Sequence, residues 1–295
     1  MPPELSVVFV NYDSARFLDR ALASLAKCDP ALDYEAIVVD NASHDQSELA
    51  GLCRRHKARL LQLRRNAGYG AAANRGFKHA RGRFIAVANP DLEFPPSSVP
   101  KLLAFMHGRS DVGAVSPQLV YPDGTPQSSA RRLPRLRYLL AGRRSPLARL
   151  LPRYAPAREF LYADVHEAGV PVSVEAVIGT FVIFRREALE QVSGFDERYF
   201  MFAEDLDICQ RLRKAGWDVV VETGARVKHF YGGVRRSRRR FTEFHRIKAL
   251  SRFLGHGRGQ TAMALLTLGA VGYLCALEAG GLLGLGEFEY SWQTR

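Results

Sequence analysis

The chain has 295 residues and a hydrophobic content of 47%, which is enough to bury one or two cores and excludes a wholly disordered protein. The four cysteines stand far apart and lack CxxC spacing, which predicts buried thiols in a reducing compartment rather than disulfides or a zinc site. They are Cys28, Cys53, Cys209 and Cys275. The N-terminal residues lack the basic start and long apolar run of a signal peptide, so we expect a cytoplasmic protein.

The formal net charge of +12 is concentrated in two segments. Residues 131–158 contain nine arginines and no acidic residue, and residues 235–240 contain five more arginines, so the rest of the chain is close to neutral. In the first segment arginines are interleaved with leucines, which favours contact with an anionic membrane surface. A solvated loop is the alternative. Nucleic acid is disfavoured as a partner because no nucleic-acid-binding motif accompanies the charge.

Apolar, β-branched runs alternate with helical patterns through the first 120 residues. We expect strands at residues 5–11, 34–40, 58–63, 83–89 and 112–116, and helices at 15–28 (capped by Ser14), 46–56, 70–80 and 97–108. Farther along we expect a strand at 176–184 with a break at Gly179-Thr180, helices at 186–194 and 204–215, and a strand at 225–229. Continuous apolar strands separated by helices predict an α/β fold with a mostly parallel central sheet flanked by helices.

Polar side chains follow three of the predicted strands: Asn11 after the first, Asp40 after the second, and the Asn89-Pro90-Asp91 run after the fourth. Ligands of such sheets bind beyond the carboxyl ends of the strands, so we expect these residues to converge. Asp40 is positioned to receive a ribose or a base edge, with a simple turn residue as the alternative, and Asp91 to hold a divalent ion.

A glycine-rich turn precedes the predicted helix at 70–80, in the sequence "NAGYGAAANRG". The segment contains neither a Walker A motif nor GxGxxG. Gly68 and Gly70 permit a tight turn into a helix whose free N–H groups can face a phosphate or a base.

Two adjacent carboxylates, Glu204 and Asp205, begin a predicted helix. The positive end of a helix dipole favours the ionised form of both, and an ionised carboxylate can act as a general base. Simple complementation of the dipole is the alternative. His229 ends the strand-like run "ARVKH" and is a candidate metal ligand, or else an ordinary loop histidine.

Five motifs, taken in order, resemble an inverting family 2 glycosyltransferase of GT-A fold, of the rhamnosyltransferase-like branch. They are "VVFVNYDSARFLDRALASL", "IVVDNAS", "NAGYGAAANRGF", "ANPDLEF" and "GTFVIFRREALEQVSGFDERYFMFAEDLDICQRLRKAGW", followed by a downstream histidine. The resemblance covers about residues 4–233.

The resemblance implies a nucleotide-diphosphate sugar as donor and a role for each matching residue. Asp205 corresponds to the catalytic base, with Glu204 beside it. The metal ligands implied are Asp91 and His229, and the cofactor is Mg²⁺ or Mn²⁺. The residues implied in nucleotide-sugar binding are Val10, Asn11, Asp40, Asn66, Gly68, Asn74, Asn89, Asp91, Gly179 and Thr180.

The chain departs from the family pattern at Asn89, where many members carry a second aspartate. One charged metal ligand is therefore missing. Because Mg²⁺ usually takes only one or two carboxylates together with substrate phosphates, we expect a weaker metal site that is held jointly with the substrate.

We expect a catalytic domain over residues 1–233, made of a nucleotide-binding half (1–120), a basic insertion (121–170) and an acceptor half (171–233). Residues 234–295 are expected to form a helical extension. Its uncharged run at 262–277 is shorter than the roughly 20 residues that span a bilayer, which favours an in-plane membrane helix or a dimer-forming helix.

The basic insertion suits a lipid-pyrophosphate-linked acceptor at the inner face of the membrane, with a glycan as the other acceptor class. Rhamnose from a thymidine-diphosphate donor is the sugar that the resemblance favours, and galactofuranose, mannose and N-acetylglucosamine are alternatives. Two other function classes stay open at this point. They are a nucleotidyltransferase-like enzyme and a non-catalytic membrane adaptor.

Overall fold

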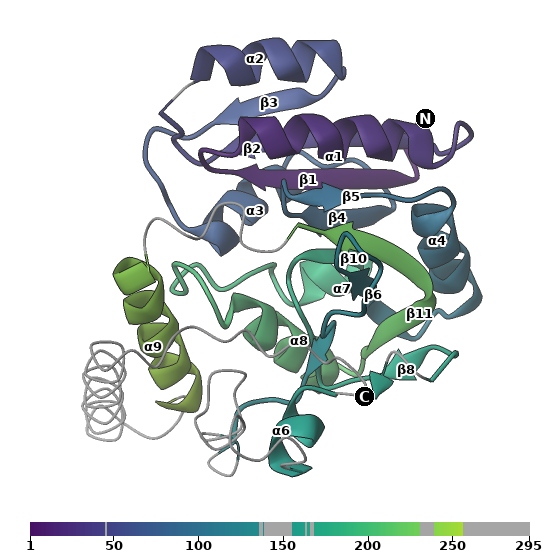
Figure 1. Cartoon of the computed structure of the whole chain (residues 1–295), viewed down its shortest axis with the longest axis vertical. Coiled ribbons are helices and arrows are strands. Elements are labelled where there is room, and N and C mark those ends of the chain that lie inside the picture. The colour runs from purple at the N-terminus through teal and green to yellow at the C-terminus, as the bar shows by residue number, and fades with distance from the viewer. Residues whose placement is uncertain are drawn as a thin grey trace.

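The computed structural model describes residues 1–44, 46–135, 138, 155–162, 164–165, 168–230 and 239–255, and one mixed sheet dominates this part of the chain (Figure 1). The strands of this sheet are β1 (Leu5–Asn11), β2 (Tyr34–Asp40), β3 (Arg59–Gln62), β4 (Phe84–Ala88), β5 (Leu92–Glu93), β6 (Val112–Val120), β8 (Val172–Ser173), β10 (Phe181–Arg185) and β11 (Asp218–His229). A separate small sheet pairs β7 (Ala130–Arg131) with β9 (Ala176–Val177).

The order of the main sheet, β3-β2-β1-β4-β10-β6-β11-β5, confirms the predicted α/β class. Strands β3, β2, β1 and β4 are parallel neighbours, and the register pairs Asn11 with Asp40 at the carboxyl ends of β1 and β2. Strand β10 runs antiparallel between β4 and β6 and pairs Phe181 with Ala88. The chain entering β10 therefore lies at the same edge of the sheet as the chain leaving β4.

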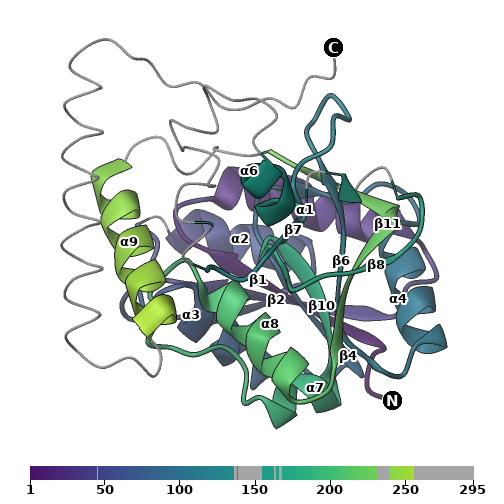
Figure 2. The same cartoon turned by 90° about the horizontal axis from the view of Figure 1, so that it is seen from below.

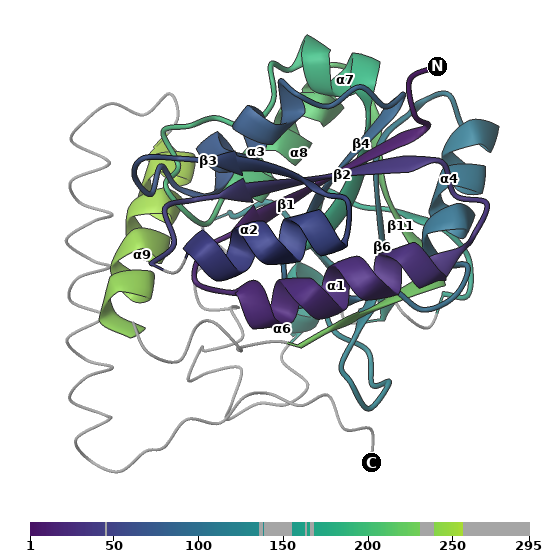
Figure 3. The same cartoon turned by 90° about the horizontal axis from the view of Figure 1, so that it is seen from above.

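Helices cover both faces of the sheet (Figure 3). One face packs against α1 (Ala15–Cys28), α2 (Gln46–Arg55) and α4 (Ser98–Gly108), and the other against α3 (Tyr69–Phe77), α7 (Arg186–Gln191) and α8 (Glu204–Lys214). Along β1, Leu5, Val7 and Phe9 enter the first core, and Val8 and Val10 enter the second, as alternation in a buried strand requires.

Two further helices lie outside this arrangement. The short α6 (Ala155–Phe160) follows the basic segment, and α9 (Arg239–Gly255) lies at the side of the layer that contains α8 (Figure 2). Ala249 and Phe253 of α9 join the second core, and the ring of His245 lies 4.6 Å from that of Phe200, in the loop before α8.

Three local expectations need correction. Strand β6 continues to Val120 rather than ending at Ser116, because the sheet buries the polar Ser116 and Gln118 as well as their apolar neighbours. Strand β11 begins at Asp218, well before the run at 225–229. The hydroxyl of Ser14 does not cap α1, since it donates to the backbone oxygen of Tyr12 at 2.6 Å.

The predicted apolar run at 262–277, Cys275 and most of both basic segments lie outside the described residues. The other three cysteines are buried free thiols, as the sequence predicts. Within the described ranges, no helix combines the length and the apolar character needed to cross a membrane. The division into a catalytic domain and an extension stays a prediction.

Candidate active site

The start of α8 meets the turn between β9 and β10. The backbone N–H of Gly179 donates to Oδ2 of Asp205 at 3.1 Å, and the N–H of Leu206 donates to Oδ1 at 2.9 Å. Asp205 is half-buried. Two backbone donors therefore fix the orientation of a half-buried carboxylate, and a carboxylate held in this way is able to accept a proton.

Glu204, the neighbour of Asp205, is in a different electrostatic state. The residue is buried, and its Oε2 has no hydrogen-bond partner among the described residues. Burial, and secondarily the charge of Asp205, raises the pKa of Glu204 to about 8, although Arg131 acts in the opposite direction. The expectation that the helix start keeps both carboxylates ionised is therefore wrong for Glu204, because desolvation outweighs the dipole.

Tyr69, at the start of α3, joins this group, and the sequence reasoning missed it. Its hydroxyl donates to the backbone oxygen of Gly179 at 2.8 Å. Burial first, and then the charges of Glu204, Asp205 and Asp91, raises the pKa of Tyr69 well above its usual value. Carboxylates from two distant parts of the sequence, the Glu204-Asp205 pair and Asp91, therefore act on one phenol. The position of Tyr69 inside the "NAGYG" turn was the available signal.

Side-chain amides build the glycine-rich turn. Oδ1 of Asn66 accepts from the N–H of Gly68 at 3.0 Å and from Nδ2 of Asn41 at 2.9 Å. Gly68 has φ +91°, and a Cβ there would overlap the backbone oxygen of Phe200, which also accepts from the N–H of Tyr69. Only glycine fits at position 68, because the backbone is in a left-handed conformation and the backbone oxygen of Phe200 leaves no space for a Cβ. The turn also brings Tyr69 to Gly179.

The aligned ends of β1 and β2 hold a buried polar cluster. Asp40 is fully buried and accepts from Oγ of Ser43 at 2.5 Å and from Nδ2 of Asn11 at 3.3 Å. The bond to Ser43 is the turn contact that the alternative interpretation of Asp40 predicts. Oδ1 of Asn11 is buried without a partner among the described residues. The side chain of Val10 lies in the core, so only its backbone is available to a ligand.

Asn74 does not point to the strand ends. Its Nδ2 donates to the backbone oxygen of Phe195 at 2.8 Å and to Glu197 at 3.0 Å, and its Oδ1 accepts from the N–H of Phe195 at 2.9 Å. Both ends of the amide are used to join α3 to the loop after α7. This geometry favours a structural role, in which Asn74 fixes α3 against the loop after α7, over the expected role in the nucleotide pocket.

The residues after β4 lie against β10 and β11. The N–H of Asn89 donates to the backbone oxygen of Thr180 at 2.9 Å, and Thr180 is itself buried. Oδ1 of Asp91 lies 3.5 Å from Nε2 of His229, and both residues are buried. Nδ1 of His229 lies 2.9 Å from Oε1 of Gln127, a residue that the sequence reasoning did not single out.

The Asp91–His229 pair fits a divalent cation in its donor chemistry. Ligands at about 2.0–2.2 Å from one ion lie roughly 3 to 4 Å from each other, which the 3.5 Å separation satisfies. In the described part of the chain, no three or more His, Cys, Asp or Glu residues gather as a metal-binding group. Any ion held here by Asp91 and His229 would take its remaining ligands from amide or backbone oxygens, substrate or water.

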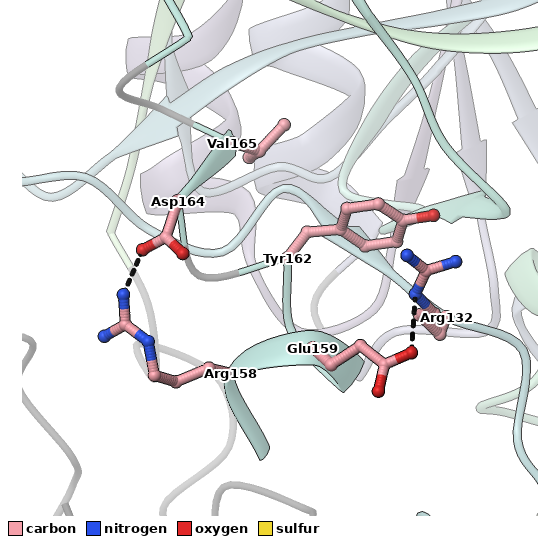
Figure 4. A pocket seen from close by; sticks show the side chains of 6 residues that line it. All are labelled: Arg132, Arg158, Glu159, Tyr162, Asp164 and Val165. Atoms are coloured by element: carbon pink, nitrogen blue, oxygen red, sulfur yellow. Dashed lines mark hydrogen bonds and ion pairs between the residues drawn. The ribbon is translucent and has the colours of Figure 1, made fainter. Parts of the chain in front are cut away.

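A small cavity follows β7 and contains none of the predicted site residues (Figure 4). In it Arg158 pairs with Asp164, and Nε of Arg132 lies 3.6 Å from Glu159. These two arginines of the basic segment are thus compensated by carboxylates, which weakens their attraction for an anionic surface.

Sequence comparisons point to one family. The model described as "Glycosyl transferase family 2" matches residues 6–193, and "Glycosyl transferase family group 2" matches residues 161–267. The N-acetylglucosaminyl-diphospho-decaprenol L-rhamnosyltransferase of Mycobacterium tuberculosis is 34% identical over 240 residues, covering 78% of this chain and 76% of that protein. The low-salt glycan biosynthesis hexosyltransferase Agl10 of Haloferax volcanii is 24% identical, covering 72% and 63%.

Solved glycosyltransferases share the fold. A mannosyltransferase of Pyrobaculum calidifontis, solved with GDP-Man and Mn²⁺, matches with a TM-score of 0.61 and 18% identity, covering 97% of this chain and 82% of that one. Residues 1–349 of S. aureus TarS in complex with UDP match with a TM-score of 0.54 and 18% identity, covering 91% and 70%. Likeness at this identity shows the fold alone, and it confirms the expected glycosyltransferase fold.

Proposed function

The chain belongs to glycosyl transferase family 2, and from this premise we propose that it transfers L-rhamnose from a nucleotide-diphosphate donor to a lipid-diphosphate-linked acceptor in cell-surface polysaccharide synthesis. The observation that carries the proposal is the 34% identity, over 78% of the chain, to an L-rhamnosyltransferase whose name specifies a decaprenol-diphosphate acceptor. An acceptor of this kind is membrane-bound, so we propose peripheral contact with the inner face of the membrane.

Asp205 is the proposed general base. Its carboxylate is held by the N–H groups of Gly179 and Leu206 and remains half-exposed, so it can take the proton of an acceptor hydroxyl. The hydroxyl oxygen then attacks the anomeric carbon from the face opposite the leaving diphosphate. A single displacement of this kind inverts the anomeric centre.

The donor nucleotide is proposed to bind at the carboxyl ends of β1 and β2. Support comes from the general location of ligands in such sheets and from the buried, unpartnered Oδ1 of Asn11 beside Asp40. Asn66 and Gly68 would line the same region through the turn before α3, with Asn89, Gly179 and Thr180 on its other side.

Asp91 and His229 are the proposed protein ligands of Mg²⁺ or Mn²⁺, on the basis of their 3.5 Å separation and their oxygen and nitrogen donors. When bound, such an ion neutralises charge on the leaving diphosphate as a Lewis acid. The amide of Asn89 adds no charge, so the two ligands are expected to depend on the donor diphosphate to complete the site.

The proposal is tested by the metal-dependent release of nucleoside diphosphate from a panel of nucleotide sugars, with and without a short-chain polyprenyl-diphosphate acceptor. We expect thymidine-diphosphate-rhamnose to be the best donor. Preference for a galactofuranose, mannose or N-acetylglucosamine donor would refute the sugar assignment and leave the family unaffected.

Asp205→Asn tests the base. General-base catalysis contributes about a hundredfold to ten-thousandfold, so kcat is expected to fall by that factor with thermal stability and donor affinity preserved. Asp123→Asn, which alters an exposed turn carboxylate, is the control. Undiminished turnover in Asp205→Asn would refute the role.

A further inference from the structure

Gln127 contacts the proposed metal ligand His229 at two points. Its Oε1 lies 2.9 Å from Nδ1 of His229, and its Nε2 donates to the backbone oxygen of the same residue at 2.9 Å. Both residues are buried, with 6% and 7% of their surfaces exposed. A side chain that lies far away in the sequence therefore holds both the ring and the backbone of His229.

The second contact fixes the chemistry of the first. A backbone oxygen can only accept, so the group of Gln127 that faces it must be the amide nitrogen, and the group that faces Nδ1 must be the carbonyl oxygen. A carbonyl oxygen also only accepts, so Nδ1 of His229 must carry the proton. In the neutral ring, Nε2 then carries the lone pair.

That lone pair belongs to the nitrogen that lies 3.5 Å from Oδ1 of Asp91. Two electron-rich atoms facing each other at this distance repel unless a proton on Nε2 or a metal cation lies between them. The backbone keeps them in place, since β5 pairs Leu92 with His229 and the N–H of Phe230 donates to the backbone oxygen of Asp91 at 2.9 Å.

We infer that Gln127 is a positioning residue, which holds His229 in the Nδ1–H tautomer and directs Nε2 toward a cation shared with Asp91. The inference rests on the proposed metal role of Asp91 and His229. Gln127 is well anchored for this task. Its N–H donates to the backbone oxygen of Leu119 at 2.8 Å, and its backbone oxygen accepts from Nε2 of Gln118 at 2.7 Å. Partners that fix the tautomer of a metal-binding histidine typically change metal affinity about 10- to 100-fold.

The first test is the tautomer itself, measured by ¹⁵N NMR of the imidazole in the metal-free full-length protein, with His229→Ala used for assignment. We expect the Nδ1–H form in the wild type and a mixed population in Gln127→Leu. An Nε2–H ring in the wild type would overturn the inference, whatever the activity of the enzyme.

The second test is Mn²⁺ affinity in the presence of thymidine diphosphate, measured from the free-ion EPR signal. Gln127→Leu is expected to weaken binding about 10- to 100-fold, and Gln127→Glu, which keeps an acceptor for Nδ1–H, to restore part of the loss. Gln191→Leu is the matched control, because that exposed glutamine also accepts a side-chain hydrogen bond, from Trp217.

The variants separate failure of this inference from failure of the proposed function. If His229→Ala binds Mn²⁺ normally, the metal role of His229 is wrong. If His229→Ala binds weakly while folded Gln127→Leu binds normally, only the role of Gln127 is wrong. Should Gln127→Leu fail to fold, the wild-type tautomer and Gln127→Glu decide the question.

Discussion

The backbone N–H of Gly179 donates to Oδ2 of Asp205 at 3.1 Å, and a Cβ built on Gly179 would lie 3.2 Å from Cβ of Asp205. The turn thus orients the proposed base and leaves little room for a side chain. In Gly179→Ala the added methyl group presses on Cβ of Asp205, which must shift slightly together with its carboxylate. Because misplacement by about 1 Å can cost a hundredfold in rate, we expect this smaller shift to lower kcat by roughly 3- to 10-fold in steady-state assays.

Gly108→Ala is the control for this substitution, since a Cβ at Gly108 would meet nothing within 4 Å. Thermal stability and nucleotide affinity of Gly179→Ala should remain near those of the wild type. A fully active Gly179→Ala would show that the hydrogen bond to Asp205 does not set the geometry of the base.

Tyr69 holds the same turn from the other side. In Tyr69→Phe the backbone oxygen of Gly179 loses its 2.8 Å hydrogen bond. The turn is then less constrained, and with it the backbone N–H of Gly179 that donates to Asp205. A hydrogen bond of this type contributes about 1 kcal/mol to stability, so kcat should fall by at most roughly fivefold. The change is measured with saturating donor and acceptor. Tyr34→Phe, on the opposite face of the sheet, should leave kcat unchanged.

The buried carboxyl of Glu204 predicts a pH dependence of stability. Its pKa rises from 4.5 to about 8 on folding, so the folded protein holds this proton more tightly than the unfolded chain. The stability gained from the neutral carboxyl is complete below about pH 4.5 and is lost progressively as the pH rises to about 8.

Glu204→Gln removes this titration while keeping the shape of the side chain. Thermal melts between pH 5 and pH 9 should give a midpoint that falls more steeply with pH in the wild type than in Glu204→Gln. Parallel curves for the two proteins would mean that Glu204 is ionised when folded.

The helices and strands that position the site could be predicted from the sequence, because buried strands appear as apolar runs and tight turns as glycine-rich segments. Asn11 and Asp40 could be expected to converge because both follow strand ends, and Glu204-Asp205 could be placed at a helix start. The pKa of Glu204 could not be predicted, since burial by residues distant in the sequence opposes the local dipole. Gln127 was missed for a similar reason, because it lies in the loop between β6 and β7, its partner His229 lies on the distant strand β11, and no local pattern connects them.

Asn74 illustrates the same limit and gives a further prediction. Its amide makes three hydrogen bonds to Phe195 and Glu197, two of them with backbone groups of Phe195. Asn74→Ala leaves these buried backbone groups unsatisfied, which costs about 2–4 kcal/mol. For a domain of this size we expect the thermal midpoint to fall by roughly 5–15 °C in calorimetry. Arg75→Ala, at the exposed neighbouring position, should change it by little.

The affinity of Asn74→Ala for thymidine diphosphate distinguishes the two possible roles of Asn74, which are fixing α3 against the loop after α7 and lining the nucleotide pocket. If Asn74 acts only by positioning α3 and the loop after α7, the variant should bind nucleotide almost normally once it is folded. At a temperature where Asn74→Ala is folded, its nucleotide affinity should therefore stay within about threefold of that of the wild type. A large loss of affinity with an unchanged thermal midpoint would instead support the pocket-lining role predicted from the sequence. In that case the contacts with Phe195 would have to open when the donor binds.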